Sequence, residues 1–211
     1  MFKVTDLKPQ KKDPNRLNVY LDGEFGFGIA RVIAPWLKVG TELDQGKIDQ
    51  LTELDAREKA YQRALHYLSY RVRSEHEVRL NLEKHDIPQD VIEDTLERLR
   101  EKSLVDDHQF ASQWVENRAA FHPRGKRALA AELRQKGVSR KIIDAVLEDV
   151  DEYHLAEKVV EKKINRVKNL DWTGFRKKMY GYLSRRGFHY SICNQIVQEK
   201  WDQLQTKNEN Y

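Results

Sequence analysis

Basic side chains gather in three stretches of the sequence. Each stretch lies on a predicted helix that precedes a predicted tight turn, or in the loop that leads into that helix. Lysine and arginine neutralise phosphates, so such clusters are typical of a surface that binds a long polyanion. If the stretches lie along one side of the protein they form one basic stripe; the alternative is a solvated face with scattered ion pairs. The candidate residues of this basic stripe are Arg71, Arg73, Arg79, Arg118, Arg124, Lys126, Arg127, Arg134, Lys136, Arg176, Lys177, Lys178, Arg185 and Arg186.

Catalytic chemistry has little support in the sequence. An enzyme needs reactive groups that converge, but the seven histidines are scattered and form neither an HExxH motif nor a pair with the single cysteine. Asp106, Asp107 and His108 could suggest a metal site, although a helix cap is the plainer interpretation. Cys193 aligns with apolar core positions and is expected to be a buried structural thiol. Because a nucleotide-binding loop is also missing, we expect a protein that is not an enzyme and has no cofactor.

The composition indicates a helical protein with a large surface for its size. Of 211 residues, 39% are hydrophobic and 34% are charged, which is a low apolar fraction for one large core. A single cysteine excludes a disulfide framework and favours a reducing, cytoplasmic location. We see no signal peptide and no apolar run near the roughly 18 residues of a membrane span, so we expect no membrane partner. Residues 151–211, with twelve basic and eight acidic side chains, carry the whole net charge of +4.

The first forty residues are expected to be rich in β-structure. RLNVYL (16–21) alternates in polarity, EFGFGI (24–29) follows, and Asp22-Gly23 between them is a strong hairpin signal. FKVTDL (2–7) can add a third strand. After residue 44 the spacing of apolar residues becomes helical and stays so.

The stretch ELRQKGVSRKIIDAVL (132–147) has the outline of a helix-turn-helix, a motif that many proteins use to read DNA. Gly137 stands where one helix would end in the left-handed conformation, and Ser139 stands where the next helix would begin. SEHE (74–77) is a capping box that would open another helix.

This pattern occurs three times along the chain. Residues 81–96, 132–147 and 182–197 align without a gap, at a spacing of about 50 residues that is typical of helical repeats. Each repeat has room for one long helix followed by the two-helix unit. We therefore expect a mainly α fold of three tandem three-helix, helix-turn-helix-like modules in an elongated curved array, preceded by a small N-terminal β-hairpin region. The turn position of the repeats holds Asp86, Gly137 and Gly187.

The second helix of the first two repeats is too acidic to lie against DNA. A recognition helix enters the major groove between two rows of phosphates, which repel carboxylates. We therefore expect the motif to be a packing module, with Trp114, Trp172 and Trp201 packed between modules rather than stacked on bases. The acidic non-core residues are Asp90, Glu93, Asp94, Glu97, Asp144, Glu148 and Asp149.

The chain resembles the RecX regulatory proteins over roughly residues 56 to 200. ALHYLSYRVRSEHEVRLNL (64–82) is similar to the first repeat of that family, and YLSRRGF (182–188) is similar to the third. Val72 stands where a proline is common, and the loop HPRGKRA (122–128) lacks the fuller glycine–lysine–glycine form. The central signature of the family lies in residues 104–138 and is met by Asp106, Asp107, Phe110, Ala111, Arg118, Gly125, Glu132, Leu133, Lys136 and Gly137.

The resemblance implies a regulator of the RecA recombinase. RecX-like proteins bind RecA, usually as its filament on single-stranded DNA, and mostly inhibit its recombinase, ATPase and co-protease activities in DNA repair and the SOS response. The family fold of three tandem three-helix modules agrees with the repeats found here. The implied partners are the RecA filament and, weakly and without sequence specificity, single- and double-stranded DNA; we expect a monomer. The alternatives are a stand-alone nonspecific DNA-binding protein or a helical scaffold for another partner.

These patterns divide the chain into four expected segments. The β-rich region and a linker occupy residues 1–55, the first two three-helix repeats occupy 56–104 and 105–150, and the third repeat with a C-terminal tail occupies 151–211.

Overall fold

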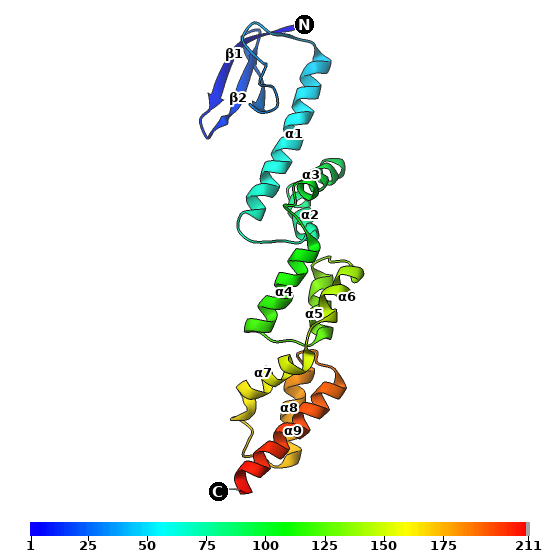
Figure 1. Cartoon of the computed structure of the whole chain (residues 1–211). Helices are drawn as coiled ribbons and strands as arrows, with labels where there is room; N and C mark the ends of the chain where they lie inside the picture. Colours follow the sequence, from blue (N-terminus) through cyan, green and yellow to red (C-terminus); the bar gives the residue numbers. More distant parts are fainter. Residues whose placement is uncertain (210–211) are drawn as a thin grey trace. The chain divides into compact units, whose positions relative to one another are not determined.

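The computed structural model describes residues 1–209, which contain nine helices and four strands (Figure 1). The chain divides into two compact units. Unit 1 comprises Met1–Val72 and Val78–Val105; unit 2 comprises Arg73–Glu77 and the described residues from Asp106 onward. Within residues 1–209, no helix is both long enough and apolar enough to span a membrane.

Unit 1 begins with a four-stranded antiparallel sheet. Asp22 and Gly23 have φ angles of 50° and 95°, the left-handed conformation that a two-residue hairpin turn requires, so the predicted hairpin is confirmed. The predicted third strand is also present, and a short fourth strand pairs with its other edge, giving the order β3-β2-β1-β4. The strands are β1 (Phe2–Gln10), β2 (Asp13–Leu21), β3 (Glu24–Ala30) and β4 (Glu42–Leu43).

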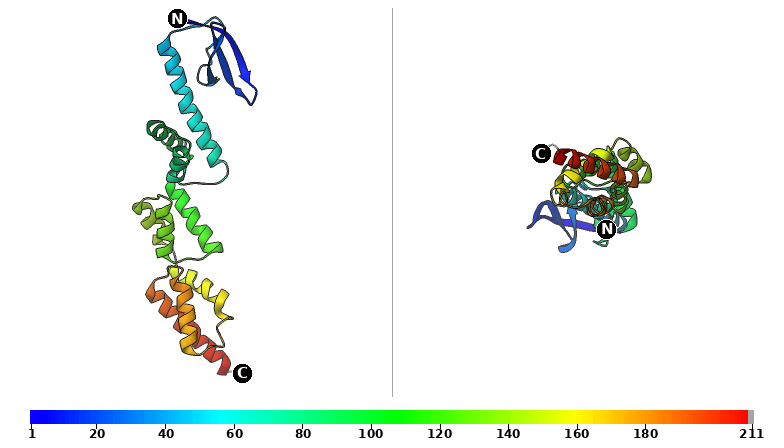
Figure 2. Two further views of the ribbon diagram at one scale, coloured as in Figure 1. Left: turned by 180° about the vertical axis from the view of Figure 1, so that it is seen from behind. Right: turned by 90° about the horizontal axis from the view of Figure 1, so that it is seen from below.

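The long helix α1 (Gln45–Leu68) lies beside the sheet in both Figure 1 and Figure 2. Asp44 starts this helix, because its side chain accepts a hydrogen bond from the Lys47 N–H at 2.7 Å. Leu51, in the first half of α1, is buried in one core with residues of the sheet. The expected boundary between residues 55 and 56 therefore falls inside a continuous helix.

The second half of α1 is the long helix of the first module. Tyr61 and Ala64 are buried in a separate core with residues of α2 (Glu75–Glu83) and α3 (Gln89–Glu101). One helix thus contributes to both hydrophobic cores of unit 1.

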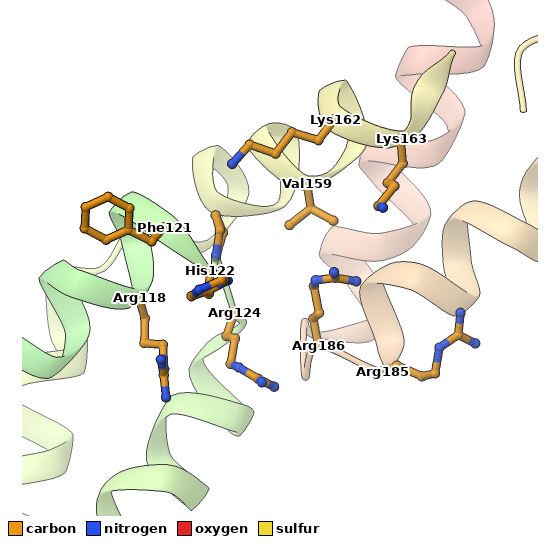
Figure 3. A pocket seen from close by; sticks show the side chains of 10 residues that line it. Arg118, Phe121, His122, Arg124, Val159, Lys162, Lys163, Arg185 and Arg186 are labelled. Carbon is orange, nitrogen blue, oxygen red and sulfur yellow. The ribbon is translucent and has the colours of Figure 1, made fainter. Parts of the chain in front are cut away.

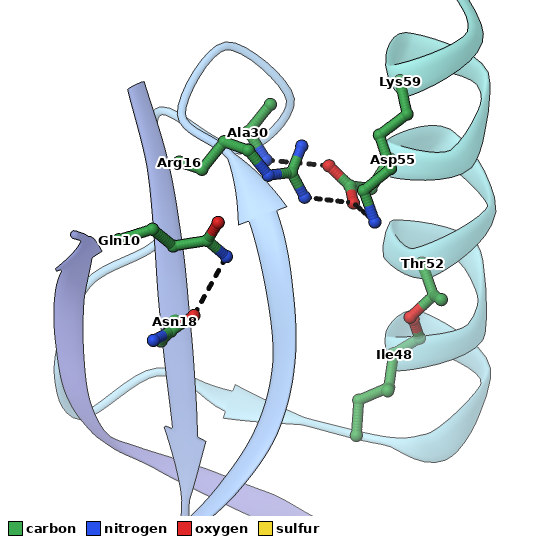
Figure 4. Close-up of polar contacts among 8 residues, drawn as sticks. All are labelled: Gln10, Arg16, Asn18, Ala30, Ile48, Thr52, Asp55 and Lys59. Atoms are coloured by element: carbon green, nitrogen blue, oxygen red, sulfur yellow. Dashed lines mark hydrogen bonds and ion pairs between the residues drawn. The ribbon is translucent and has the colours of Figure 1, made fainter. Parts of the chain in front are cut away.

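A buried ion pair links α1 to the sheet (Figure 4). Asp55 is only 1% exposed and accepts hydrogen bonds from Arg16 Nη2 at 2.7 Å and from the Ala30 N–H at 2.8 Å, while Lys59 Nζ lies 2.9 Å away. Burial alone would raise the pKa of Asp55, but these three donors together outweigh it and leave the pKa below its ordinary value. The carboxylate therefore stays charged and fixes the sheet against the helix.

Unit 2 contains the second and third three-helix modules. In each module an apolar core joins all three helices, and the residues of the two-helix pattern that were expected to be internal include the fully buried Leu133 and Leu183. Cys193 is 0% exposed, so the predicted structural thiol is confirmed. The helices are α4 (Asp107–Phe121), α5 (Lys126–Gln135), α6 (Arg140–Glu148), α7 (Glu152–Ile164), α8 (Trp172–Ser184) and α9 (Tyr190–Glu209).

The predicted helix starts are largely confirmed. Asp106 caps α4, because its Oδ1 accepts hydrogen bonds from the N–H groups of His108 and Gln109 at 2.8 and 3.0 Å. In the capping box at 74–77, Ser74 Oγ accepts a hydrogen bond from the Glu77 N–H at 3.2 Å, and the Glu77 carboxylate also pairs with Lys136 Nζ, 2.7 Å away.

The tryptophans pack inside modules, so the prediction that they pack between modules is wrong. Trp114 lies against Phe110 in the second module, with ring centroids 5.8 Å apart. Trp172 and Trp201 lie 5.5 Å apart in the core of the third. Each ring completes the small core of its own three-helix module.

Unit 2 contains the same close contact twice, first at Gly137. This residue has a φ angle of 77°, and a Cβ placed on it would lie 2.2 Å from the Cβ of His76. Beside it, Ser74 Oγ donates to the Lys136 carbonyl at 2.6 Å, and the N–H after Ser74 donates to Asp107 Oδ1 at 2.8 Å. The start of one helix therefore rests directly on the glycine turn.

The second contact is at Gly187, which also has a φ angle of 77°. A Cβ there would lie 2.6 Å from both the Cβ and the backbone nitrogen of Ala128. The Gly125 N–H donates to the Arg186 carbonyl at 2.9 Å, and the N–H after Gly125 donates to Glu152 Oε1 at 3.3 Å. The second contact thus repeats the arrangement of the first, with a backbone N–H in place of the serine hydroxyl.

The third turn of this kind, at Asp86, has the same left-handed backbone, with a φ angle of 56°. Asp86 is exposed, so this turn needs only a residue that tolerates the conformation, and aspartate does. Glycine is required at Gly137 and Gly187 by conformation and by space together.

We expect Gly137→Ala to destabilise the protein much more than Gly23→Ala, at a left-handed glycine where an added Cβ meets nothing within 4 Å. Both variants place a Cβ on a left-handed residue, which costs about 1–2 kcal/mol, but only Gly137→Ala also drives a methyl group into a packed neighbour, which adds about 1–3 kcal/mol. Urea denaturation monitored by circular dichroism measures both. Equal losses in the two variants would contradict the packing role of the turn.

For Asp55 we expect a loss of about 3–5 kcal/mol in Asp55→Ala, because Arg16 is left buried without its partner. The folded-state pKa of Asp55 is lowered, so its contribution is fully present above the ordinary pKa and is lost as the pH falls through the folded-state value. Urea denaturation of Asp55→Asn should therefore show a weaker loss of stability than wild type as the pH falls below about 5. If the stability of wild type and of Asp55→Asn fell equally with decreasing pH, the stabilising role of the ionised Asp55 would be contradicted.

Candidate polyanion-binding site

A basic pocket of about 600 Å³ lies in unit 2 where three helix ends meet (Figure 3). The end of α4 and the loop after it form one wall, the last turns of α7 form another, and the end of α8 forms the third. No aspartate or glutamate is among the described residues that line it. The lining residues are Arg118, Phe121, His122, Pro123, Arg124, Val159, Lys162, Lys163, Arg185 and Arg186.

The C-terminal ends of the helices explain why so many cations can gather here. Arg118 lies in the last turn of α4, Lys162 and Lys163 lie in the last turn of α7, and Arg185 is the C-cap of α8. The C-terminus of a helix carries a partial negative charge that stabilises nearby cations by about 0.3–1 kcal/mol each. The helix ends therefore offset part of the repulsion among the side chains.

A single carboxylate orients two of the arginines. Glu132 Oε2, on α5, accepts hydrogen bonds from Arg118 Nε at 2.7 Å and from Trp114 Nε1 at 2.8 Å. Its Oε1 lies 2.8 Å from Arg124 Nε, a buried atom that makes no well-aligned hydrogen bond, so this pair is ionic. One glutamate thus contacts two of the six lysine and arginine side chains of the pocket, which stays strongly positive.

The other wall is ordered by Tyr182. Lys163 Nζ and the Arg185 guanidinium lie 5.7 and 5.5 Å from the centroid of its ring, within the range of cation–π attraction. Arg186 Nη1 donates to the Tyr182 carbonyl at 3.4 Å. In Figure 3, Lys163 and Arg186 point into the space between α7 and the end of α8. The arrangement presents several donors to one space, as phosphate oxygens require.

Four candidate residues of the basic stripe are brought together in this pocket: Arg118, Arg124, Arg185 and Arg186. Arg176 and Lys177 line a different cavity of unit 2. Arg127, Arg134 and Lys178 are exposed.

Other members of the basic stripe are engaged in local contacts. Arg79 forms an ion pair with Glu93 that lowers the pKa of that carboxyl group to about 2. Lys136 pairs with Glu77, and Lys126 Nζ donates to the Glu148 carbonyl at 3.0 Å. Arg71 donates a hydrogen bond to the Val72 carbonyl at 2.9 Å. Arg73 also makes a noncovalent interaction with another residue.

Sequence reasoning missed Lys162, Lys163 and Phe121, which complete the pocket. The basic run EKKINRVK (161–168) was a usable signal, since two lysines close to a predicted helix end can point into a shared site. Phe121, a ring that is 67% exposed at the pocket, had no distinguishing pattern.

Four family models match the chain. Residues 2–44 match the Regulatory protein RecX N-terminal domain, and residues 60–99, 106–147 and 149–197 match the first, second and third three-helix domains of RecX. The chain belongs to the RecX family. A regulatory protein RecX from Limosilactobacillus reuteri (strain DSM 20016) is 32% identical over 215 residues, which cover 100% of this chain and 81% of that protein. The one from Bacillus subtilis (strain 168) is 31% identical over 98% of this chain and 78% of its own length.

Two solved RecX structures are also similar. The crystal structure of a regulatory protein RecX has a TM-score of 0.78 and 31% identity, covering 94% of this chain and 100% of that one. The crystal structure of RecX from Lactobacillus salivarius has a TM-score of 0.65 and 28% identity, covering 71% and 98%. The resemblance of the central signature and the three-module fold are therefore confirmed.

We expect sulfate to stabilise the wild type more than a Lys162→Gln/Lys163→Gln variant. An anion in the pocket relieves the repulsion among the cations, and at ten times its dissociation constant it should raise the melting temperature by about 3 °C. The matched control is Lys84→Gln/Lys102→Gln, which removes the same charge from exposed positions of unit 1. Differential scanning fluorimetry measures these melting temperatures. If sulfate raised the melting temperature of the pocket variant and of the control variant equally, the pocket would not bind anions.

Proposed function

We propose that the protein binds RecA filaments on single-stranded DNA and regulates RecA, mostly by lowering its recombinase, ATPase and co-protease activities in DNA repair and the SOS response. Membership of a family of regulatory proteins supports this proposal. The single observation that carries it is the basic pocket, where six lysine and arginine side chains gather and one carboxylate contacts only two of them. A filament on DNA offers the dense negative charge that such a pocket attracts.

A protein that reads DNA sequence on its own is a weaker candidate function, because the helix-turn-helix units are used for packing. The turns at Gly137 and Gly187 lie in close contact with His76 and Ala128. The second helices keep their acidic faces exposed, as at Asp94 in α3. Direct DNA contact is therefore expected to be weak, independent of sequence and strongly dependent on salt.

Regulation would follow from differential binding. A protein shifts an equilibrium only by its preference for one state over another, so the regulator must bind one state of the filament more tightly than free RecA or bare DNA. It would act as a monomer in the cytoplasm, without a cofactor and without catalysing a reaction itself.

In RecA ATP hydrolysis stimulated by single-stranded DNA, we expect the wild-type protein to lower the rate at substoichiometric amounts. Lys162→Glu/Lys163→Glu should need at least about tenfold more protein for half-inhibition, which corresponds to a loss of about 1.4 kcal/mol. Lys84→Glu/Lys102→Glu, with the same change in net charge, should inhibit like wild type. The titration is followed by phosphate release.

Three outcomes of this titration would count against the proposal. No effect of the wild type at several-fold excess, with binding to bare DNA intact, would favour the stand-alone DNA-binding protein. No effect on RecA and no DNA binding would favour a scaffold for another partner. If Lys162→Glu/Lys163→Glu inhibited RecA at the same concentration as wild type, the pocket would not be needed for inhibition.

A further inference from the structure

A second cavity of unit 2, of about 480 Å³, combines aromatic rings with cations. It lies along α8 and at the start of α9. Three aromatic side chains and two basic ones line it, and the described lining residues include no carboxylate. The residues are Trp172, Thr173, Arg176, Lys177, Tyr180, Gly181 and Tyr190.

The aromatic rings are held firmly from behind. Trp172 packs on Trp201, 5.5 Å away, and Trp201 packs in turn on the fully buried Phe175, 5.1 Å away. Tyr180 and Tyr190 support each other edge to face, with centroids 5.9 Å apart and planes at 68°. Tyr190 is nevertheless 61% exposed. The cavity therefore offers preformed ring surfaces, which cost little entropy when a ligand binds.

The cations of the cavity are available for a ligand. Arg176 and Lys177 are exposed, and no ion-pair partner for either is found among the side chains of residues 1–206. Gly181 has no side chain to fill the space, and the atom nearest to a Cβ placed there would be Arg185 Nη1, at 3.0 Å. Flat rings beside unpaired cations fit a ligand that has both flat faces and negative charge.

Arg185 connects this cavity to the basic pocket. It lines the basic pocket, and its guanidinium lies against Gly181 of the aromatic cavity. Residues 181 and 185 are one helical turn apart, about 6 Å along α8. One extended ligand can therefore contact the cations of the basic pocket and the aromatic rings of the cavity at the same time.

We propose that Trp172, Tyr180 and Tyr190 form a stacking site for the unpaired bases of single-stranded nucleic acid, whose phosphates contact Arg176, Lys177 and Arg185. Single strands are bound in this way, by aromatic side chains beside a positive groove, and each stacked base contributes substantially to affinity without sequence preference. The inference rests on the proposed function in placing the protein on single-stranded DNA, and adds that it contacts the bases as well as the phosphates.

The test compares two oligonucleotides of equal length, oligo(dT) and an abasic strand with the same phosphates, by fluorescence anisotropy without RecA. We expect the wild type to bind oligo(dT) about tenfold more tightly than the abasic strand, from one or two stacked bases. Tyr190→Ala should lose about tenfold on oligo(dT) only, whereas Tyr190→Phe, which keeps the ring, should stay within about twofold. The matched control is Tyr70→Ala, which removes an exposed tyrosine ring from unit 1 that does not line the cavity.

Equal affinity of the wild type for the two strands would overturn the stacking site, and so would absence of binding to either. This comparison needs no variant, so it holds even if Tyr190→Ala folds poorly. A Tyr190→Ala loss that is equal on both strands would also overturn it. The ATPase titration separates the two proposals: base-dependent binding without any effect on RecA would refute the proposed function alone, and inhibition of RecA without base dependence would refute the stacking site alone.

Discussion

Close approach of backbone at Gly137 and Gly187 is the constraint on which the packing of unit 2 depends. At both places the start of a helix lies where a side chain would otherwise be, and the helix N–H groups are satisfied by a carboxylate, Asp107 or Glu152, at the start of another helix. Buried backbone donors need such partners. The helix-turn-helix outline thus serves as a joint, because the turn that would flank DNA in a reader here contacts the start of another helix.

The same joint positions the basic pocket. Arg186 precedes Gly187, and its carbonyl receives the Gly125 N–H, so the loop that carries Arg124 is tied to the end of α8. The negative ends of α4, α7 and α8 then hold cations that would otherwise repel one another. A bound anion would stabilise such a cluster further, since one glutamate is its only carboxylate contact among the described residues.

Local patterns predicted the elements well, because they depend on neighbours in the chain. The Asp22-Gly23 hairpin, the Asp106 cap and the three left-handed turns all follow from short-range chemistry. The pocket and the Arg16–Asp55 pair could not be read in the same way. Their partners lie on different elements, 39 residues apart for the ion pair, and the pattern of one helix does not say which other helix ends it meets. The aromatic cavity was missed for the related reason that Trp172 is both a core residue and a surface one.

Cys193 has a consequence for the conditions in which the protein can work. Its side chain is fully buried, and burial, with a smaller contribution from Glu152, raises the pKa of the thiol to about 11. Only the thiolate reacts readily with peroxides and electrophiles, and at neutral pH almost none is present. The single cysteine is thereby shielded from oxidants and alkylating agents, so modification of this thiol does not open the core of the third module.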